Sequence, residues 1–277
     1  MPENKREIKF SIPTNINQFF VPVLVIIAIG FAFFSGTLWQ KLEAKKGGET
    51  AQGTTPQQAA APAQPDKVAV SLDTIKGLFD KDFVKFCDKN SKVLFVEISD
   101  PSCPYCQVAS GLNPSLNTQV VAQFKLVKDG GTYVAPVVEM RKLVEAGKAS
   151  LVWIYSPGHG NGEMGTKALY CANEKGKFWG VSDLLMTAKG YDFLNNTIKN
   201  DKTKSGDLAT FLKSAIDPAF LKECVDSGKY DARLTSDAQL AQSLGFQGTP
   251  DFYVNATNFA GAYSYTDMKS AVDAALK

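Results

Sequence analysis

Charged residues are missing from one stretch near the start of the chain: none occurs between Lys9 and Lys41. Within it, residues 19–39 read FFVPVLVIIAIGFAFFSGTLW. As a helix they would cross about 30 Å, the thickness of a hydrocarbon core. Trp39 at the end of the run suits the headgroup boundary. We therefore predict a short tail at residues 1–18 and a transmembrane helix at residues 19–39.

A cleaved signal peptide is the alternative for this segment. Signal peptides usually have a shorter apolar region that is closely followed by small residues at a cleavage site. Here the run Ala59-Ala60-Ala61 comes well after the apolar stretch, which favours a retained anchor. Basic residues flank the stretch on both sides, so charge does not decide which side of the membrane the rest of the chain occupies.

The chain is also poor in net charge and in cysteine. The formal net charge of +2 gives no reason to expect a nucleic-acid partner. Five cysteines are too few for a scaffold built on disulfides. Residues 40–66 are rich in Gly, Ala, Gln, Thr and Pro, and this composition predicts a flexible linker. One folded domain is then expected at residues 67–277.

The hydrophobic pattern of that domain predicts an α/β protein. An amphipathic helix is expected at residues 71–90, with Cys87 as a buried thiol on its apolar side. Strands are predicted at four short apolar runs, residues 92–99, 151–155, 252–254 and 259–263. A helical insertion at about 160–245 separates the second and third strands, and a helix closes the chain. This order of elements is typical of an α/β fold with a helical insertion.

The sequence Cys103-Pro104-Tyr105-Cys106 follows the first strand and opens a helix. The thiolate is the reactive form of cysteine, and a helix N-terminus favours it through unpaired N–H groups and the positive end of the dipole. Pro104 fits the first helical turn. Cys106 lies one turn on, so it can form a disulfide with Cys103 or resolve a mixed disulfide. We expect Cys103 to be the exposed nucleophile and Cys106 the buried partner.

A zinc site is the alternative for this motif, because half of a zinc site has the same spacing. Such a site needs a second pair of nearby ligands. Cys171 and Cys224 are single and distant, and His159 is the only histidine of the chain. The spacing therefore favours redox chemistry over metal binding, and we expect no cofactor other than the redox-active disulfide.

A proline before a strand is the second feature of interest. In Gly248-Thr249-Pro250-Asp251 the proline directly precedes the third predicted strand, where it is tolerated, and its peptide bond could be cis. Taken alone, it could equally be an ordinary turn proline.

Three motifs together resemble the DsbA-like branch of the thioredoxin superfamily. They are FVEISDPSCPYC at residues 95–106, ALYCANEKGKFW at 168–179, and the stretch from CVDSGKYD to GFQGTPDFYVN at 224–255. The resemblance covers roughly residues 70–277. It implies a thioredoxin-like fold with a helical insertion and a redox-active pair of cysteines.

The resemblance also implies roles for residues outside the cysteine motif. Pro250 would be a cis-proline that faces Cys103, and the Thr249 backbone would pair with a bound substrate chain. The substrates would be polypeptides with cysteines. The recycling partner would be a membrane quinone-linked oxidase of the DsbB or vitamin-K-epoxide-reductase (VKOR) type. One departure is Tyr105, which stands where the best-known oxidases carry histidine.

Four further residues have both a functional and an ordinary interpretation. Glu97 could relay the proton of Cys106, as in related proteins, or be a hydrogen-bonded strand residue. Cys171 and Cys224 could form a second, structural disulfide, as the resemblance suggests, or be two small buried side chains. His159 lies on a glycine-rich loop that could present it to a site, although a lone loop histidine is usually structural or solvated.

The sequence therefore predicts a membrane-anchored thiol–disulfide oxidoreductase that donates the Cys103–Cys106 disulfide to protein substrates. A reductase or isomerase on the same fold is the first alternative, because redox poise sets the direction. A metal-binding or passive interaction domain is the second. Disulfide donation needs an oxidising compartment, so we expect a single-pass protein of the cell membrane with its domain outside the cytoplasm.

Overall fold

The computed structural model describes residues 70–277. The predicted transmembrane helix at residues 19–39 and the linker at residues 40–66 lie outside the described residues. Within residues 70–277, no helix is both long and apolar enough to cross a membrane.

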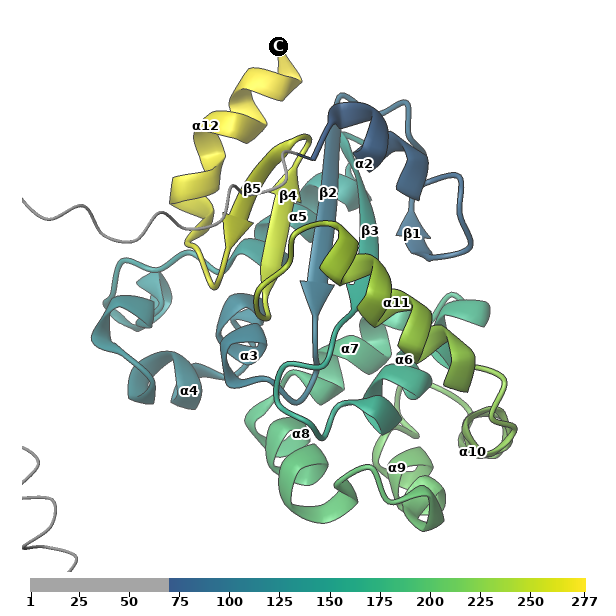
Figure 1. Ribbon diagram of the computed structural model, residues 1–277. Helices are drawn as coiled ribbons and strands as arrows, with labels where there is room; N and C mark the ends of the chain where they lie inside the picture. Colours follow the sequence, from purple (N-terminus) through teal and green to yellow (C-terminus); the bar gives the residue numbers. More distant parts are fainter. Residues whose placement is uncertain (1–69) are drawn as a thin grey trace, which may run out of the picture. The chain divides into compact units, whose positions relative to one another are not determined.

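A five-stranded sheet forms the centre of the described domain, with strand order β1-β3-β2-β4-β5 (Figure 1). Its strands are β1 Val84–Phe86, β2 Val93–Ser99, β3 Ala149–Tyr155, β4 Asp251–Val254 and β5 Thr257–Ala260. The pair β2 and β3 is parallel, and all other neighbours are antiparallel. Every residue of β2 and β3 is buried. Continuous apolar runs such as VLFVEIS suit strands whose two faces are both covered.

Alternating side chains of β2 point into two separate cores. Leu94 and Ile98 pack with residues of α2 Leu72–Leu78 and α11 Asp231–Ser243. Phe95 packs on the other face, with residues of α3, α5 and α12. The bounds of these three helices are α3 Pro104–Ser110, α5 Pro136–Glu145 and α12 Tyr265–Leu276. Glu97 follows Phe95 by two positions and therefore belongs to this second face.

A block of helices lies between β3 and β4 in the chain and gathers beyond the end of the sheet where β2 finishes (Figure 1). The block contains α6 Glu163–Glu174, α7 Phe178–Leu185, α8 Ala188–Asp192, the π-helical turn η3 Phe193–Ile198, the 3-10 turn η4 Lys202–Lys204, α9 Ser205–Phe211 and α10 Pro218–Asp226, followed by α11. These helices bury the largest of the apolar clusters, which joins Trp153 and Tyr155 of β3. The predicted fold, α/β with a helical insertion, is confirmed.

The expectation of one helix at residues 71–90 is wrong. Helix α2 ends at Leu78, and the chain turns so that β1 can pair with β3 at the sheet edge. The Lys85 ammonium donates hydrogen bonds to the carbonyls of Phe79 and Lys81 and thereby satisfies the end of the helix. Cys87 is consequently exposed, with a φ of 61°, and is not the buried thiol we expected.

Two other regions differ in detail from the sequence pattern. The last strand, β5, ends at Ala260, because Gly261 takes a φ of 107° that turns the chain toward α12. The segment between α3 and β3 contains α4 Pro114–Gln119, the 3-10 turns η1 Ala122–Phe124 and η2 Val127–Asp129, and α5. Phe124 and Tyr133 of this segment pack against Val108 of α3, so the segment supports the helix that follows Cys103.

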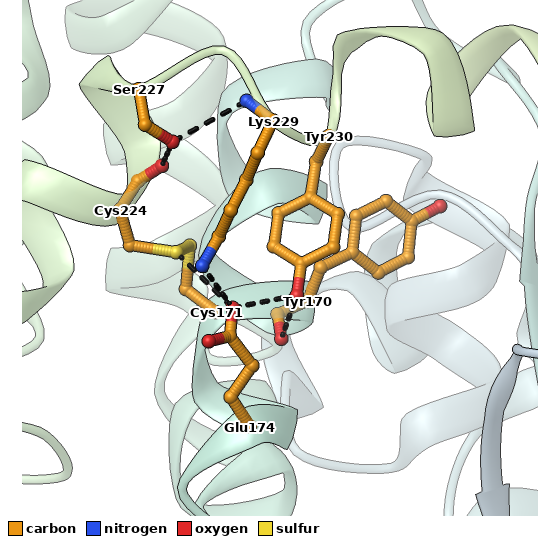
Figure 2. A network of polar contacts seen from close by, with 7 residues as sticks. All are labelled: Tyr170, Cys171, Glu174, Cys224, Ser227, Lys229 and Tyr230. Atoms are coloured by element: carbon orange, nitrogen blue, oxygen red, sulfur yellow. Dashed lines mark hydrogen bonds and ion pairs between the residues drawn. A yellow bond between two sulfur atoms is a disulfide. The ribbon is translucent and has the colours of Figure 1, made fainter.

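Cys171 of α6 and Cys224 of α10 form a disulfide, with Cα atoms 6.1 Å apart (Figure 2). Figure 2 also shows the Glu174 carboxylate beside the bridge, where its oxygen lies 3.5 Å from the Cys224 sulfur. That carboxylate accepts a hydrogen bond of 2.6 Å from the Tyr230 hydroxyl and pairs with the Lys229 ammonium at 2.7 Å. The bridge joins α6 to α10 through cysteines that are 53 residues apart in sequence, and the ion pair joins α6 to the turn that follows α10.

Loss of this disulfide should destabilise the domain, because it closes a loop of about 50 residues in the unfolded chain. We expect the Cys171→Ser, Cys224→Ser double variant to lose about 2–4 kcal/mol of unfolding free energy in urea titrations. Cys87→Ser is the matched control, since Cys87 is an exposed free thiol. Equal stability of the double variant and the control would contradict the prediction.

Candidate active site

The cysteine motif begins at the turn that follows β2. The Cys103 N–H donates to the Asp100 carbonyl at 3.0 Å, and Cys103 is the N-cap residue of α3. Pro104 occupies the first helical position, where its missing N–H and fixed φ are tolerated. Gly111 ends the helix with a φ of 69°. The strand–turn–helix context that the sequence predicts for the motif is confirmed.

The Cys103 thiol lies at the centre of several hydrogen-bonding groups. Its Sγ is 3.4 Å from the Thr249 carbonyl oxygen. A hydrogen bond from the Cys106 thiol is the largest influence on the pKa of Cys103, which it lowers to about 6 against the opposing effect of burial. The Thr249 side chain and the main-chain N–H groups of Tyr105 and Cys106 lower this pKa further. Cys103 is therefore largely a thiolate at neutral pH.

Cys106 has the opposite character. It lies inside the protein, and burial is the largest of the causes that raise the pKa of Cys106 well above its usual value. The nearby Cys103 raises it further. The Cys106 Sγ accepts a hydrogen bond of 3.4 Å from the Asp100 N–H at the end of β2. One thiol of the pair is thus held protonated, and its proton stabilises the charge on the other.

The expected exposure of Cys103 is not observed, since the residue is only 3% exposed. Met186 packs against both cysteines. A loop at residues 156–161 lies above them and is held by the buried Asp100 carboxylate. The N–H groups of Gly158 and His159 donate to one carboxylate oxygen at 2.8 and 3.1 Å. The other oxygen accepts from the main chain and hydroxyl of Ser102, both at 2.7 Å.

Gly158 is required by the close approach of this loop to the site. A Cβ atom on Gly158 would collide with the Thr249 hydroxyl and would lie 3.3 Å from the Cys103 Cβ. His159, for which both a functional and an ordinary interpretation were possible, belongs to the same loop. Its main chain is bound to Asp100, and the residue is exposed.

Glu97 is buried beneath the motif, with 4% exposure. Desolvation is the main cause that raises its pKa to about 7, and polar contacts with the side chains of Ser99 and Trp153 oppose this rise. A carboxyl group with such a pKa can take up or release a proton near neutral pH.

The loop before β4 brings Thr249 and Pro250 to Cys103. The Thr249–Pro250 peptide bond is cis, and the Thr249 carbonyl faces the Cys103 thiol. The Tyr105 side chain is 42% exposed and contacts the ring of Phe124, with ring centroids 6.1 Å apart. The structure therefore brings the residues of the two sequence motifs together around one sulfur atom.

Sequence reasoning missed three residues of this site, namely Ser99, Asp100 and Met186. Asp100 is the residue that ties the loop at residues 156–161 to the turn before Cys103. Its place directly before a Pro-Ser-Cys turn was a visible signal, but its partners lie almost 60 residues away. Met186 comes from the helical block and carries no signal in the sequence.

A metal-ligand geometry occurs elsewhere in residues 70–277. Cys171, Glu174 and Cys224 have ligand atoms within 4.8 Å of one another. The two sulfurs are bonded in a disulfide, however, so neither is available as a thiolate ligand. Cys103 and Cys106 belong to no such group of three within the part of the chain that the structure describes.

Comparison with known families identifies a family model described as Thioredoxin, which matches residues 137–274. The match begins after Cys103 and Cys106, so the family model does not include the cysteine motif.

Three relatives match most of this chain at low identity. A protein of Rickettsia conorii, provisionally named protein-disulfide oxidoreductase RC0029, is 22% identical over 225 residues, which are 79% of this chain and 70% of that protein. The related protein of Rickettsia prowazekii is 24% identical, over 77% of this chain and 66% of that protein. The Na(+)/H(+) antiporter NhaA 3 of Salinispora tropica is 24% identical over 70% of this chain. This chain spans only 24% of the antiporter's length.

Solved structures give the same fold. BdbD from Bacillus subtilis has a TM-score of 0.50 and 20% identity, and the match covers 70% of this chain and 92% of BdbD. The α-DsbA1 of Wolbachia pipientis has a TM-score of 0.52 and 15% identity, with 70% and 91% covered. The family model and these structures together show that the chain has a thioredoxin-like fold, similar to that of DsbA-type proteins.

The asymmetry of the two thiols can be measured by alkylation. We expect the rate of iodoacetamide labelling of Cys103 to rise with pH with a midpoint of about 6, because the thiolate is the reacting form. Cys106→Ala should move this midpoint upward, since it removes the largest stabilising hydrogen bond. A Cys87→Ser background removes the exposed thiol. A midpoint near the ordinary cysteine value of about 8.5 in both proteins would contradict the proposed thiolate.

Proposed function

We propose that this protein is an oxidase that transfers a disulfide from Cys103 and Cys106 to cysteines of protein substrates. The observation that carries the proposal is the Cys103 thiol, with a pKa of about 6, beside a protonated Cys106. A stabilised thiolate favours the reduced form of the enzyme. The oxidised form is then a stronger oxidant of other thiols.

The exchange requires two steps. A substrate thiolate attacks the Cys103 sulfur, the Cys103–Cys106 bond breaks, and Cys106 leaves with the electron pair as a thiolate that takes up a proton. A second substrate thiolate then attacks the substrate sulfur of the mixed disulfide. Cys103 leaves as a thiolate, and the substrate has lost two electrons to the enzyme. The low pKa of Cys103 makes it a good leaving group in this second step.

Glu97 is the proposed proton donor for Cys106 in the first step. Protonation of the Cys106 thiolate prevents it from attacking Cys103 again, and so gives the second substrate thiol time to react. The pKa of about 7 for Glu97 allows the carboxyl group to supply this proton and to regain one from solvent near neutral pH.

The substrate chain would bind in an extended conformation along Thr249 and Pro250. The Thr249 main chain lies beside the reactive sulfur, so pairing with it would bring a substrate cysteine within reach of Cys103. A hollow of about 460 Å³ is lined by Phe124, Tyr133 and Tyr263 among others, and the exposed ring of Tyr105 contacts Phe124. This aromatic surface supports loose binding of apolar substrate side chains.

A reductase or isomerase on the same fold is the second candidate, because the direction of exchange depends on the reduction potential. The low pKa of Cys103 favours the oxidase.

The proposed location is the outer side of the cell membrane. Disulfides persist in oxidising compartments, and the Cys171–Cys224 bridge fits such a location. The charge-free run at residues 19–39 would anchor the protein. A membrane quinone-linked oxidase of the DsbB or VKOR type would reoxidise the pair, as the resemblance implies.

Oxidation of a reduced peptide with two cysteines tests the function. We expect the oxidised domain to convert the peptide to its disulfide with loss of its own, and Cys103→Ser to abolish the reaction. Cys87→Ser is the matched control and should retain full activity, because Cys87 is a free thiol outside the site. If equilibration with glutathione gave a reduction potential of about −270 mV for the Cys103–Cys106 pair, as for thioredoxin, the protein would be a reductase instead.

Membrane topology is tested by proteolysis of intact cells from which any outer envelope has been removed. We expect externally added protease to digest residues 67–277, and alkaline washing to leave the full chain in the membrane fraction. Protection of the domain until the membrane is permeabilised would place it in the cytoplasm and contradict the proposed location.

A further inference from the structure

Ser99 is the last residue of β2 and is fully buried, and its hydroxyl has no hydrogen-bond partner of normal geometry. A buried hydroxyl that makes no well-formed hydrogen bond is energetically unfavourable and uncommon in folded proteins. Such a group needs an explanation, and a catalytic role is one of those known.

Ser99 lies near both Glu97 and Cys106, the two groups of the site that would carry the proton. Glu97 and Ser99 are two residues apart on one strand, so their side chains lie on the same face of the sheet. The Cys106 sulfur accepts a hydrogen bond from the N–H of Asp100, the next residue after Ser99. The thiol therefore lies against the end of β2, where Ser99 is located.

The Ser99 hydroxyl affects the pKa of both Glu97 and Cys106. It lowers the pKa of the Glu97 carboxyl and also lowers the pKa of the Cys106 thiol. Glu97 is not among the groups that dominate the pKa of Cys106, which are Cys103, Ser99 and the Asp100 main chain, together with burial. Ser99 is thus the group that both Cys106 and Glu97 face.

We propose that the Ser99 hydroxyl passes the proton between the Cys106 thiol and the Glu97 carboxyl. This role rests on the proposed exchange function of the two cysteines. When Cys106 leaves as a thiolate, Ser99 gives it the hydroxyl proton and takes the carboxyl proton of Glu97. The reverse transfer forms the Cys106 thiolate when it attacks Cys103. One proton moves in each direction, and the hydroxyl is regenerated.

A cavity of about 250 Å³ would connect Glu97 with solvent. Its lining includes Glu97, Ser110, Trp153 and Met186 at the inner end. Arg141 and Asp183, which pair at 2.9 Å and are partly exposed, also line it. The cavity has room for water and several polar groups to bind it. In this proposal Glu97 regains its proton from water in the cavity.

Other titratable groups face this proton path from the elements packed around it. They are Cys103 and Cys106 on α3, Asp100 after β2, Tyr155 opposite Ser99 on β3, Arg141, Lys142 and Glu145 on α5, and Asp183 on α7. Cys103 and Glu97, with pKa values of about 6 and 7, titrate near neutral pH.

The test uses a chromogenic aromatic disulfide and the reduced Cys87→Ser protein. Cys103 attacks the reagent and releases one coloured thiolate, and Cys106 then attacks Cys103 and releases a second. The first phase reports the Cys103 thiolate, and the second reports proton removal from Cys106. We expect Ser99→Ala to leave the first phase unchanged and to slow the second about tenfold or more near neutral pH. The difference in second-phase rate between Ser99→Ala and the protein with Ser99 should become smaller as pH rises, because hydroxide then removes the Cys106 proton directly.

Two matched variants distinguish the loss of the Ser99 hydroxyl from the loss of packing around it. Ser99→Thr keeps the hydroxyl, whereas Ser99→Val has the same shape without it. The threonine variant should retain most of the second-phase rate and the valine variant should not, even if Ser99→Ala loosens the core. Ser150→Ala is a further control, because it removes another buried hydroxyl. Ser150 lies near the start of β3, at the opposite end of the strand from Tyr155, and its hydroxyl is hydrogen-bonded to Asp88 and Ser91. This substitution should change neither phase.

The possible outcomes are distinguishable. Equal second phases in the threonine and valine variants would overturn the role of Ser99. A slow first phase in the protein with Ser99 intact, without a midpoint near pH 6, would instead contradict the proposed function of Cys103.

Discussion

The hydrogen bond between the two active-site thiols is the interaction on which the rest of the site depends. Burial keeps the proton on Cys106, and that proton is the largest cause of the low pKa of Cys103. The same low-dielectric surroundings therefore act in opposite directions on neighbouring sulfurs, because only one of them can donate. The turn after β2, the N-terminus of α3 and the loop before β4 hold the two atoms in this relation.

Access to the reactive sulfur is limited by a single carboxylate. Asp100 binds both the turn before Cys103 and the glycine-rich loop that covers it. Loop and nucleophile are thus positioned by one buried group, and Gly158 allows an approach that a side chain would prevent. An accessible thiolate is open to oxidation, and this cover restricts contact with solvent in the resting state.

Two sides of the site then have separate tasks in the proposed mechanism. Substrate thiols approach Cys103 along Thr249, whereas the proton of Cys106 would leave through the interior by way of Ser99 and Glu97. The central strand β2 serves both, since it ends at the active-site turn and carries on one face the two side chains that we propose to transfer the proton.

The sequence by itself determined the central strands, the helical insertion and the position of the cysteine motif at a helix start. Continuous apolar runs, helical periodicity and the Cys103-Pro104 cap act over short range, which makes them visible in one chain. It did not determine that residues 84–86 leave the first helix to pair at the sheet edge. Only the tertiary structure decided the cover over Cys103, the buried position of the Ser99 hydroxyl and the joining of Cys171 to Cys224, because burial and long-range contacts depend on segments that packing brings together.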